Sequence, residues 1–240
     1  MDEGIRIGIL ARKGSKMPVF IAIYCVLIGM TCRLHSSERH RKRYAFVKTL
    51  TSLCFIGIAV YAGVISGGSQ LFFYLLPGFW FALAGDYLLG LAHAERNYKG
   101  LKFLLGAAAF MFAHIAFYLA FCAEFSFNVK ELILPALFPA ITLIIIRGDD
   151  FSLGKMKVPG LMYSFFVALL CSKGVSLFLS EGISGGTAMV LAGGMLFLIS
   201  DIVLLFMYFH VSSPKKVLGV INLATYYLAM GFLALSILAL

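Results

Sequence analysis

Charged side chains are scarce in this sequence of 240 residues, of which 13% are charged and 61% are hydrophobic. Acidic residues are the scarcest, with 11 Asp and Glu against 20 Lys and Arg. A soluble fold of this length needs polar residues on the outer face of every element, and soluble domains are typically about 45–50% apolar. The shortage of charge excludes an ordinary soluble domain and indicates an integral membrane protein.

Cysteines are few and lack the spacings that support cysteine chemistry. None belongs to a CxxC pair or lies beside a histidine. They lie within or at the edges of apolar runs, at Cys25, Cys32, Cys54, Cys122 and Cys171. This odd, scattered set predicts buried thiols rather than a disulfide framework or a zinc site.

The sequence also lacks the signatures of a phosphate-binding loop and of a nucleic-acid-binding module. The glycine-rich "GISGG" at 182–186 lacks the strand-then-helix setting of a phosphate loop. No segment resembles a nucleic-acid-binding module, and the net charge of +9 is explained by membrane topology. We therefore expect no metal, no cofactor and no nucleic-acid partner.

Long apolar runs separated by short polar stretches make up most of the chain. A membrane-spanning helix needs about 20 mostly apolar residues. Eight runs qualify, at 17–33, 45–66, 71–92, 100–122, 131–146, 159–179, 187–209 and 218–240. We predict an all-α polytopic membrane protein, with a basic N-terminal segment (1–16) and one eight-helix domain (17–240). The weakest run is 131–146, because it is short and contains Pro135 and Pro139.

Lys and Arg are distributed unevenly between the two sides of this bundle. Fourteen lie on one side: Arg33, Arg39, Arg41, Lys42, Arg43, Lys48, Arg96, Lys99, Lys102, Arg147, Lys155, Lys157, Lys215 and Lys216. Five lie on the other: Arg6, Arg12, Lys13, Lys16 and Lys130. The richer side is predicted to face the cytoplasm, with both termini outside. The "RHRKRY" run at 39–44 either fixes this topology or binds anionic headgroups. A bacterial inner membrane and the endoplasmic reticulum both fit, and the oligomeric state stays open.

Two aspartates, Asp86 and Asp201, lie inside apolar runs. An ionised carboxylate at the centre of a spanning helix costs roughly 2.5–3.5 kcal/mol on insertion scales, so such residues normally face the bundle interior and have a partner or a task. At 1.5 Å per residue, the two lie roughly 9 and 12 Å from the cytoplasmic ends of their helices. The alternative is that each merely pairs with a neighbouring cation or caps backbone groups.

Other polar residues reach similar depths from the same side. Lys48 and Asn222 lie about one turn deep, with Tyr226 and Tyr227 slightly more than two turns deep, so these groups and the aspartates are predicted to share one pocket. Asn222 and Tyr226 are spaced i, i+4 and lie on one helix face, as do His114 and Tyr118. His114 lies near the midplane, where it serves as an interhelical hydrogen-bonding group or as part of a site. Lys173 lies in the outer half of its helix and either snorkels or pairs with another buried group.

Four blocks of the sequence resemble the signature segments of the YhhN family of lysoplasmalogenase-like membrane proteins. They are "FALAGDYLL" (81–89), "AHIAFYLAF" (113–121), "GGMLFLISDIVLLFMYF" (193–209) and "ATYYLAMGFLALS" (224–236). The resemblance covers most of 45–240 and implies hydrolysis of the vinyl ether bond of lysoplasmalogen, giving a fatty aldehyde and glycerophosphocholine or glycerophosphoethanolamine. It implies functional positions at Asp86, His114, Asp201, Tyr226, Tyr227 and Lys48. The chain departs from the family pattern at Lys173, where an apolar residue is expected.

Acid–base chemistry on a vinyl ether fits this set of residues. Burial and a neighbouring carboxylate both favour protonation, so two close aspartates would hold one proton between them and divide the roles of general acid and oxocarbenium stabiliser or base. The catalytic set is then Asp86, Asp201, His114 and Tyr226. The substrate-binding set is Lys48, Asn222, Tyr227 and Tyr118, with Lys48 on the phosphate of a lysophospholipid. Membrane lipids are the other expected partners.

Two other classes of protein remain open. A proton-coupled transporter also uses intramembrane Asp, His and Lys, and it predicts polar groups on both sides of the midplane. A non-catalytic lipid-binding protein predicts that the aspartates are dispensable. An assay for fatty aldehyde discriminates between the hydrolase and these two alternatives. The distance between the two carboxyl groups tests whether they share one site.

Overall fold

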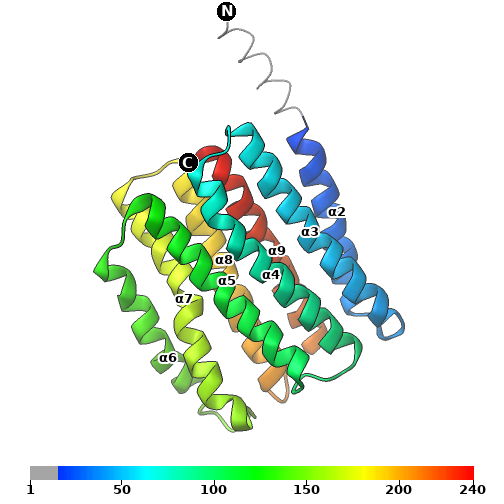
Figure 1. Ribbon diagram of the computed structural model, residues 1–240. Helices are drawn as coiled ribbons and strands as arrows, with labels where there is room; N and C mark the ends of the chain where they lie inside the picture. Colours follow the sequence, from blue (N-terminus) through cyan, green and yellow to red (C-terminus); the bar gives the residue numbers. More distant parts are fainter. Residues whose placement is uncertain (1–15) are drawn as a thin grey trace, which may run out of the picture.

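The computed structural model describes residues 16–240 and shows a bundle of long helices (Figure 1). These helices are α2 (Met17–His35), α3 (Arg41–Ile65), α4 (Gln70–Ala94), α5 (Leu101–Phe125), α6 (Ile133–Ile145), α7 (Lys157–Ser180), α8 (Gly185–Phe209) and α9 (Lys215–Ala239). Short 3-10 turns lie at η1 (Glu38–His40), η2 (Val129–Leu132) and η3 (Gly154–Met156). The prediction of an all-α polytopic fold is confirmed. Of the expected basic segment 1–16, residues 1–15 lie outside the described residues.

Seven of the helices are long and apolar enough to cross a membrane. The exception is α6, whose 13 residues span about 20 Å against the roughly 30 Å of a hydrocarbon core. The run 131–146 was predicted as an eighth spanning helix. It is shorter than predicted because its start is taken up by η2 and the chain turns at Ile146.

Helix ends follow local sequence signals. Ser69 caps α4, where its hydroxyl accepts a hydrogen bond from the Phe72 backbone. The preceding turn needs glycine, because Gly67 and Gly68 have φ of 74° and 77°. Ser184 and Thr187 form a reciprocal capping box at the start of α8. These signals separate apolar runs that would otherwise merge.

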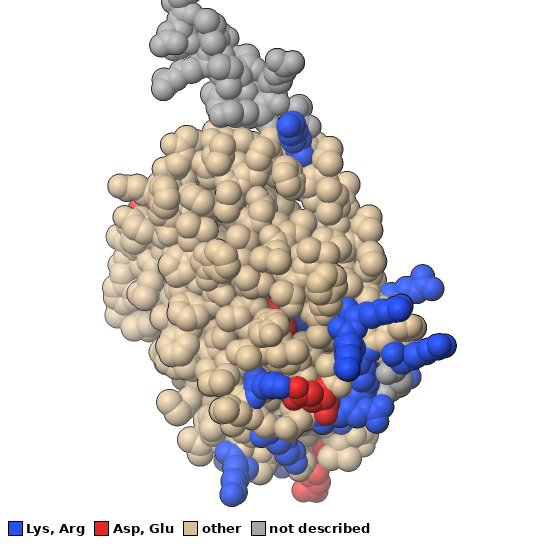
Figure 2. Space-filling model, turned by 45° about the vertical axis from the view of Figure 1, so that its right-hand side comes forward, with Lys and Arg blue, Asp and Glu red and all other residues tan. Residues whose placement is uncertain are grey.

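Successive helices run antiparallel, so the start of α2 and the end of α9 lie at the same end of the bundle (Figure 1). The opposite end carries the connections α2–α3, α4–α5, α6–α7 and α8–α9, and we call it the basic end. Lys and Arg gather there in the lower part of Figure 2. The one-sided distribution of cations counted along the sequence is therefore a property of the folded molecule.

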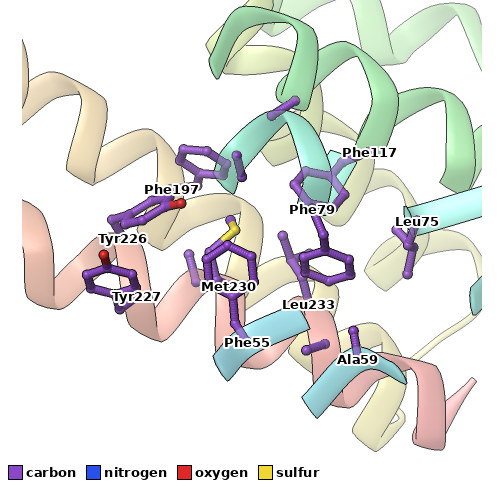
Figure 3. Close-up of a cluster of buried hydrophobic side chains, with 14 of the residues drawn as sticks. Phe55, Ala59, Leu75, Phe79, Phe117, Phe197, Tyr226, Tyr227, Met230 and Leu233 are labelled. Carbon is purple, nitrogen blue, oxygen red and sulfur yellow. The ribbon is translucent and has the colours of Figure 1, made fainter. Parts of the chain in front are cut away.

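Aromatic and aliphatic side chains of α3, α4, α5, α8 and α9 fill the centre of the bundle (Figure 3). Phe55, Phe79, Phe117 and Tyr227 are completely buried. Small residues bring the helices close: a Cβ at Gly194 of α8 would lie 2.8 Å from the Leu170 carbonyl oxygen of α7. This tight core positions the polar groups described next.

Candidate functional site: an ion pair, an Asp–His pair and two adjoining cavities

Asp86 lies on α4, eight residues before the helix ends at Ala94. Its fully buried carboxylate meets side chains from α3 and α9. Lys48 Nζ lies 2.9 Å from Oδ1, while the hydroxyls of Ser52 and Tyr226 donate to Oδ2 at 2.5 and 2.6 Å. An opposite charge and two hydrogen bonds replace the water that a buried carboxylate loses. Asp86 is thus part of a buried ion pair that joins three helices.

Two further tyrosines, Tyr227 and Tyr24, form hydrogen bonds next to this ion pair. The Tyr227 hydroxyl donates to the Lys48 carbonyl oxygen at 3.0 Å, and the Tyr24 hydroxyl donates to the Tyr227 carbonyl oxygen at 2.7 Å. The structure brings together Lys48, Asp86, Tyr226 and Tyr227, which the depth argument placed in one pocket. All four side chains are buried, and none of them lines either of the two cavities described below.

Asp201 lies on α8, eight residues before the helix ends at Phe209. Its Oδ2 lies 2.8 Å from Nε2 of His114 on α5, and the Tyr163 hydroxyl of α7 donates to Oδ1 at 3.2 Å. His114 is fully buried, whereas the Asp201 side chain keeps 7% exposure. The result is an Asp–His pair, held by a tyrosine, with the carboxylate at its accessible side.

Aromatic rings separate the two carboxylates. The Phe197 ring lies 4.0 Å from the His114 ring and 5.4 Å from the Tyr226 ring, measured between centroids, and Figure 3 shows Phe197 beside Tyr226. No hydrogen bond or ion pair joins Asp86 to Asp201 within residues 16–240. The two carboxylates therefore have separate hydrogen-bonding partners and form two neighbouring sites, rather than the single pocket that was expected.

An apolar cavity of about 290 Å³ lies between α5, α7 and α8. Asp201 and the Tyr163 ring form part of its wall. The rest of the wall is apolar or glycine: Leu89, Phe103, Leu104, Ala107, Ala108, Phe110, Met111, Met156, Pro159, Gly160, Met162, Leu204, Leu205 and Phe209. Two of the lining residues, Leu104 and Met162, are 39% and 61% exposed, so part of the cavity wall reaches the surface of the bundle. The cavity places one carboxyl group at the wall of a space suited to an alkyl chain.

A second cavity, the basic vestibule, has a volume of about 910 Å³ and lies at the basic end. It adjoins the apolar cavity, because Leu104, Met156 and Phe209 line both. Its cationic and histidine side chains are Arg41, Lys99, Lys155, Lys215, Lys216, His35, His93 and His210. None of its lining residues in the described part of the chain is acidic. A hollow lined by charge of one sign raises the local concentration of oppositely charged ligands.

Lys48 lies in neither cavity. It was expected to bind a substrate phosphate, and it was placed at the correct depth. Its ammonium group instead neutralises Asp86 inside the bundle, with a side-chain exposure of only 7%. Because the Lys48 ammonium group forms a buried ion pair with Asp86, it cannot also bind a lipid headgroup at the surface.

Asn222 and Tyr118 also lie away from the roles predicted for them. The Asn222 amide donates to the Ser200 carbonyl oxygen at 2.9 Å and to its hydroxyl at 2.8 Å, which ties α9 to α8. The Tyr118 hydroxyl donates to Glu131 at 3.1 Å, toward the end opposite the basic one. Spacing of i, i+4 places two residues on one helix face, but it does not predict which neighbouring helix each of the two side chains contacts.

Lys173 and Glu131 form a second buried ion pair, with Nζ 3.0 Å from Oε1 and side chains only 1% exposed. Lys173 also donates to the Ser126 carbonyl oxygen, and the Ser172 hydroxyl donates to the Glu131 carbonyl oxygen at 2.6 Å. Pairing with another buried group was one of the two predictions for Lys173, and it is confirmed. The pair fastens η2 to α7.

Sequence reasoning missed Ser52, Tyr163 and Glu131. Ser52 follows Lys48 by four residues, so its place on the same helix face was a readable signal. Tyr163 and Glu131 contact partners 38 and 42 residues away, and nothing in their local sequence indicates those contacts. Within residues 16–240, no group of three or more His, Cys, Asp and Glu side chains is arranged to hold a metal ion.

Comparison with known proteins gives one match. The model of the YhhN family matches residues 43–237, which is more than half of the chain and includes Lys48, Asp86, His114, Asp201 and Tyr226. Searches of curated proteins and of solved structures give no significant match. With its multi-pass helical fold and a family match that spans both aspartates, this chain belongs to the YhhN family.

Proposed function

We propose that this protein is a hydrolase that cleaves the vinyl ether bond of lysoplasmalogen, releasing a fatty aldehyde and glycerophosphocholine or glycerophosphoethanolamine. Family membership supports a hydrolase of this class. The observation that carries the proposal is the position of Asp201, a carboxyl group held by His114 at the wall of an apolar cavity. We propose that a single-chain ether lipid enters this cavity from the bilayer, past the exposed side chains of Leu104 and Met162.

The reaction requires proton transfer to carbon. In its acid form, the Asp201–His114 pair is a protonated carboxyl with a neutral imidazole, or equivalently a carboxylate with an imidazolium. We assign Asp201 as the general acid that delivers this proton to the β-carbon of the vinyl ether, because it is the member of the pair that lines the cavity. The product is an oxocarbenium ion beside the newly formed carboxylate.

Water completes the hydrolysis. The Asp201 carboxylate stabilises the oxocarbenium ion and accepts a proton as water adds to it, which regenerates the acid. The resulting hemiacetal loses the glycerol oxygen as an alcohol and leaves the aldehyde. One water is consumed, and no electron is transferred.

The other polar residues act by positioning. Tyr163 holds the Asp201 carboxylate from the side opposite His114. The Lys48–Asp86 pair fixes Tyr226 through the 2.6 Å hydrogen bond, and Tyr226 packs on Phe197, which in turn packs on the His114 ring. We propose that the basic end faces the cytoplasm, because the positive-inside rule favours that orientation for the side richer in Lys and Arg.

The experiment is an assay for fatty aldehyde, using purified full-length protein and 1-O-alkenyl-glycerophosphocholine. The matched control substrate is the saturated 1-O-alkyl lipid, which has no double bond to protonate. In D₂O, protonation at the β-carbon leaves one deuterium on the carbon next to the aldehyde carbonyl, and in ¹⁸O-labelled water the aldehyde oxygen carries the label. Aldehyde without carbon-bound deuterium would contradict the mechanism.

Absence of aldehyde, with folded protein that still binds the lipid, would favour the non-catalytic alternative. A transporter needs a polar route through both halves of the bundle. The polar group toward the far end, Glu131 with Lys173, lines neither cavity. This arrangement favours the hydrolase over the transporter.

A further inference from the structure

We propose that the basic vestibule is the binding site for the substrate phosphate, and that it selects lysophospholipids over ether lipids without phosphate. The inference deepens the proposed function and rests on it. The order of features in the molecule matches the order of groups in such a lipid. The alkyl tail takes the apolar cavity, the reacting bond lies at Asp201, and the headgroup lies beyond the three residues that both cavities share.

Charge supports this assignment. The vestibule is lined by four lysines, Lys99, Lys155, Lys215 and Lys216, and none of its lining residues in the described part of the chain is acidic. Elsewhere at the same end, Lys102 is paired with Glu95 on the surface, and the buried Lys48 is paired with Asp86. The four lysines of the vestibule therefore lie where the apolar cavity ends, and no acidic residue of the described part of the chain lines that space.

The wall behind these lysines is built of packed rings. The Tyr98 hydroxyl and His93 Nδ1 lie 3.1 Å apart, and the Tyr98 and Tyr208 rings lie 5.3 Å apart. His35 packs against His93 with ring centroids 4.9 Å apart. Exposed lysines in front of a packed aromatic and imidazole wall suit a phosphate that carries either choline or ethanolamine, because ammonium groups bind phosphate as point charges.

Lys215 and Lys216, at the start of α9, allow a matched test. Both are exposed and line the vestibule, whereas Lys42 and Arg43 on α3 are exposed at the same end and line neither cavity. The variants K215Q/K216Q and K42Q/R43Q remove the same charge from the same end of the molecule. Only the first changes the proposed site.

The measurement is equilibrium binding to the purified full-length variants in neutral detergent. The probe is 1-O-alkyl-glycerophosphocholine, which is not cleaved, and its comparison ligand is the 1-O-alkyl-glycerol of the same chain length. We expect K215Q/K216Q to weaken phospholipid binding about tenfold, equal to roughly 1.4 kcal/mol, and to leave alkyl-glycerol binding unchanged. The K42Q/R43Q protein should match the wild type, and added salt should weaken phospholipid binding in the wild type.

Equal losses in the two double variants would overturn the inference, because they would indicate general surface attraction. Competition by inorganic phosphate as effective as that of the phospholipid would assign the vestibule to free phosphate and also overturn it. Because the probe is not hydrolysed, the binding result is independent of catalysis. A wild type that binds as expected but makes no aldehyde would contradict only the proposed function.

Discussion

The two intramembrane aspartates lie at similar depth but in opposite settings. Asp86 is fully buried, and it is neutralised by Lys48 and hydrogen-bonded by Ser52 and Tyr226. Asp201 has no lysine or arginine partner among the described residues, and it faces an apolar cavity from its pair with His114. A buried acid paired with a lysine stabilises helix packing, whereas one held at a cavity wall is available for proton transfer. Depth alone does not distinguish the two roles.

The largest expected effect is on turnover in Asp201→Asn. The amide keeps the shape of the side chain but cannot donate the proton, and general acid catalysis typically contributes about 10²–10⁴-fold. We therefore expect aldehyde release to fall by about that factor, with little change in the thermal unfolding midpoint. Asp149→Asn, at an exposed loop position, is the matched control and should keep full activity.

The Asp86 site should respond in the opposite way, through stability. Replacing Asp86 with Leu leaves the Lys48 ammonium buried without its counter-charge, and breaking a buried pair typically costs about 3–5 kcal/mol. Lys48→Met combined with Asp86→Leu removes both charges and should recover most of that loss. Thermal unfolding of the single and double variants in one detergent measures this, and a double variant no more stable than the single would show that the charges are not coupled.

Removing the Tyr163 hydroxyl tests whether Tyr163 positions the Asp201 carboxylate for catalysis. Tyr163→Phe deletes one hydrogen bond to the carboxylate, and hydrogen bonds to charged groups contribute roughly 1.5–3 kcal/mol, so we expect kcat to fall at least about tenfold. Binding of the saturated alkyl lipid should be unchanged. A weaker lipid affinity with normal kcat would instead make Tyr163 a packing residue of the cavity.

The smallest effect on turnover is expected at Tyr118. Its hydroxyl donates to the Glu131 carboxylate beside Lys173, remote from the basic end, so Tyr118→Phe should cost roughly 1.5–3 kcal/mol of stability and leave the Asp201 site unchanged. Aldehyde release should match the wild type. A large loss of turnover would return Tyr118 to the substrate-binding set in which the sequence placed it.

Hydropathy predicts most of this fold, because lipid requires each spanning segment to satisfy its own backbone hydrogen bonds. The helix α6 is the exception: its apolar run has nearly the required length, but a 3-10 turn and a loop take up its ends. Depth along each helix was also predictable from the rise per residue. Lys48, Asp86 and Tyr226 were grouped correctly for that reason.

Rotation of each helix about its axis was not predictable. Asn222 and Tyr226 share a face of α9, yet Asn222 meets Ser200 on α8 while Tyr226 meets Asp86 on α4. Likewise, His114 was within reach of two aspartates by depth, and only the packing of α5 against α7 and α8 assigns it to Asp201. Contacts between helices depend on tertiary packing, which a single sequence does not reveal.

The most direct test of the account is a single-turnover measurement of aldehyde release by two folded proteins, Asp201→Asn and the double variant Lys48→Met with Asp86→Leu. The double variant should still release aldehyde in one turnover, whereas Asp201→Asn should release almost none. Aldehyde release by Asp201→Asn together with an inactive double variant would contradict the assignment of the transferable proton to Asp201.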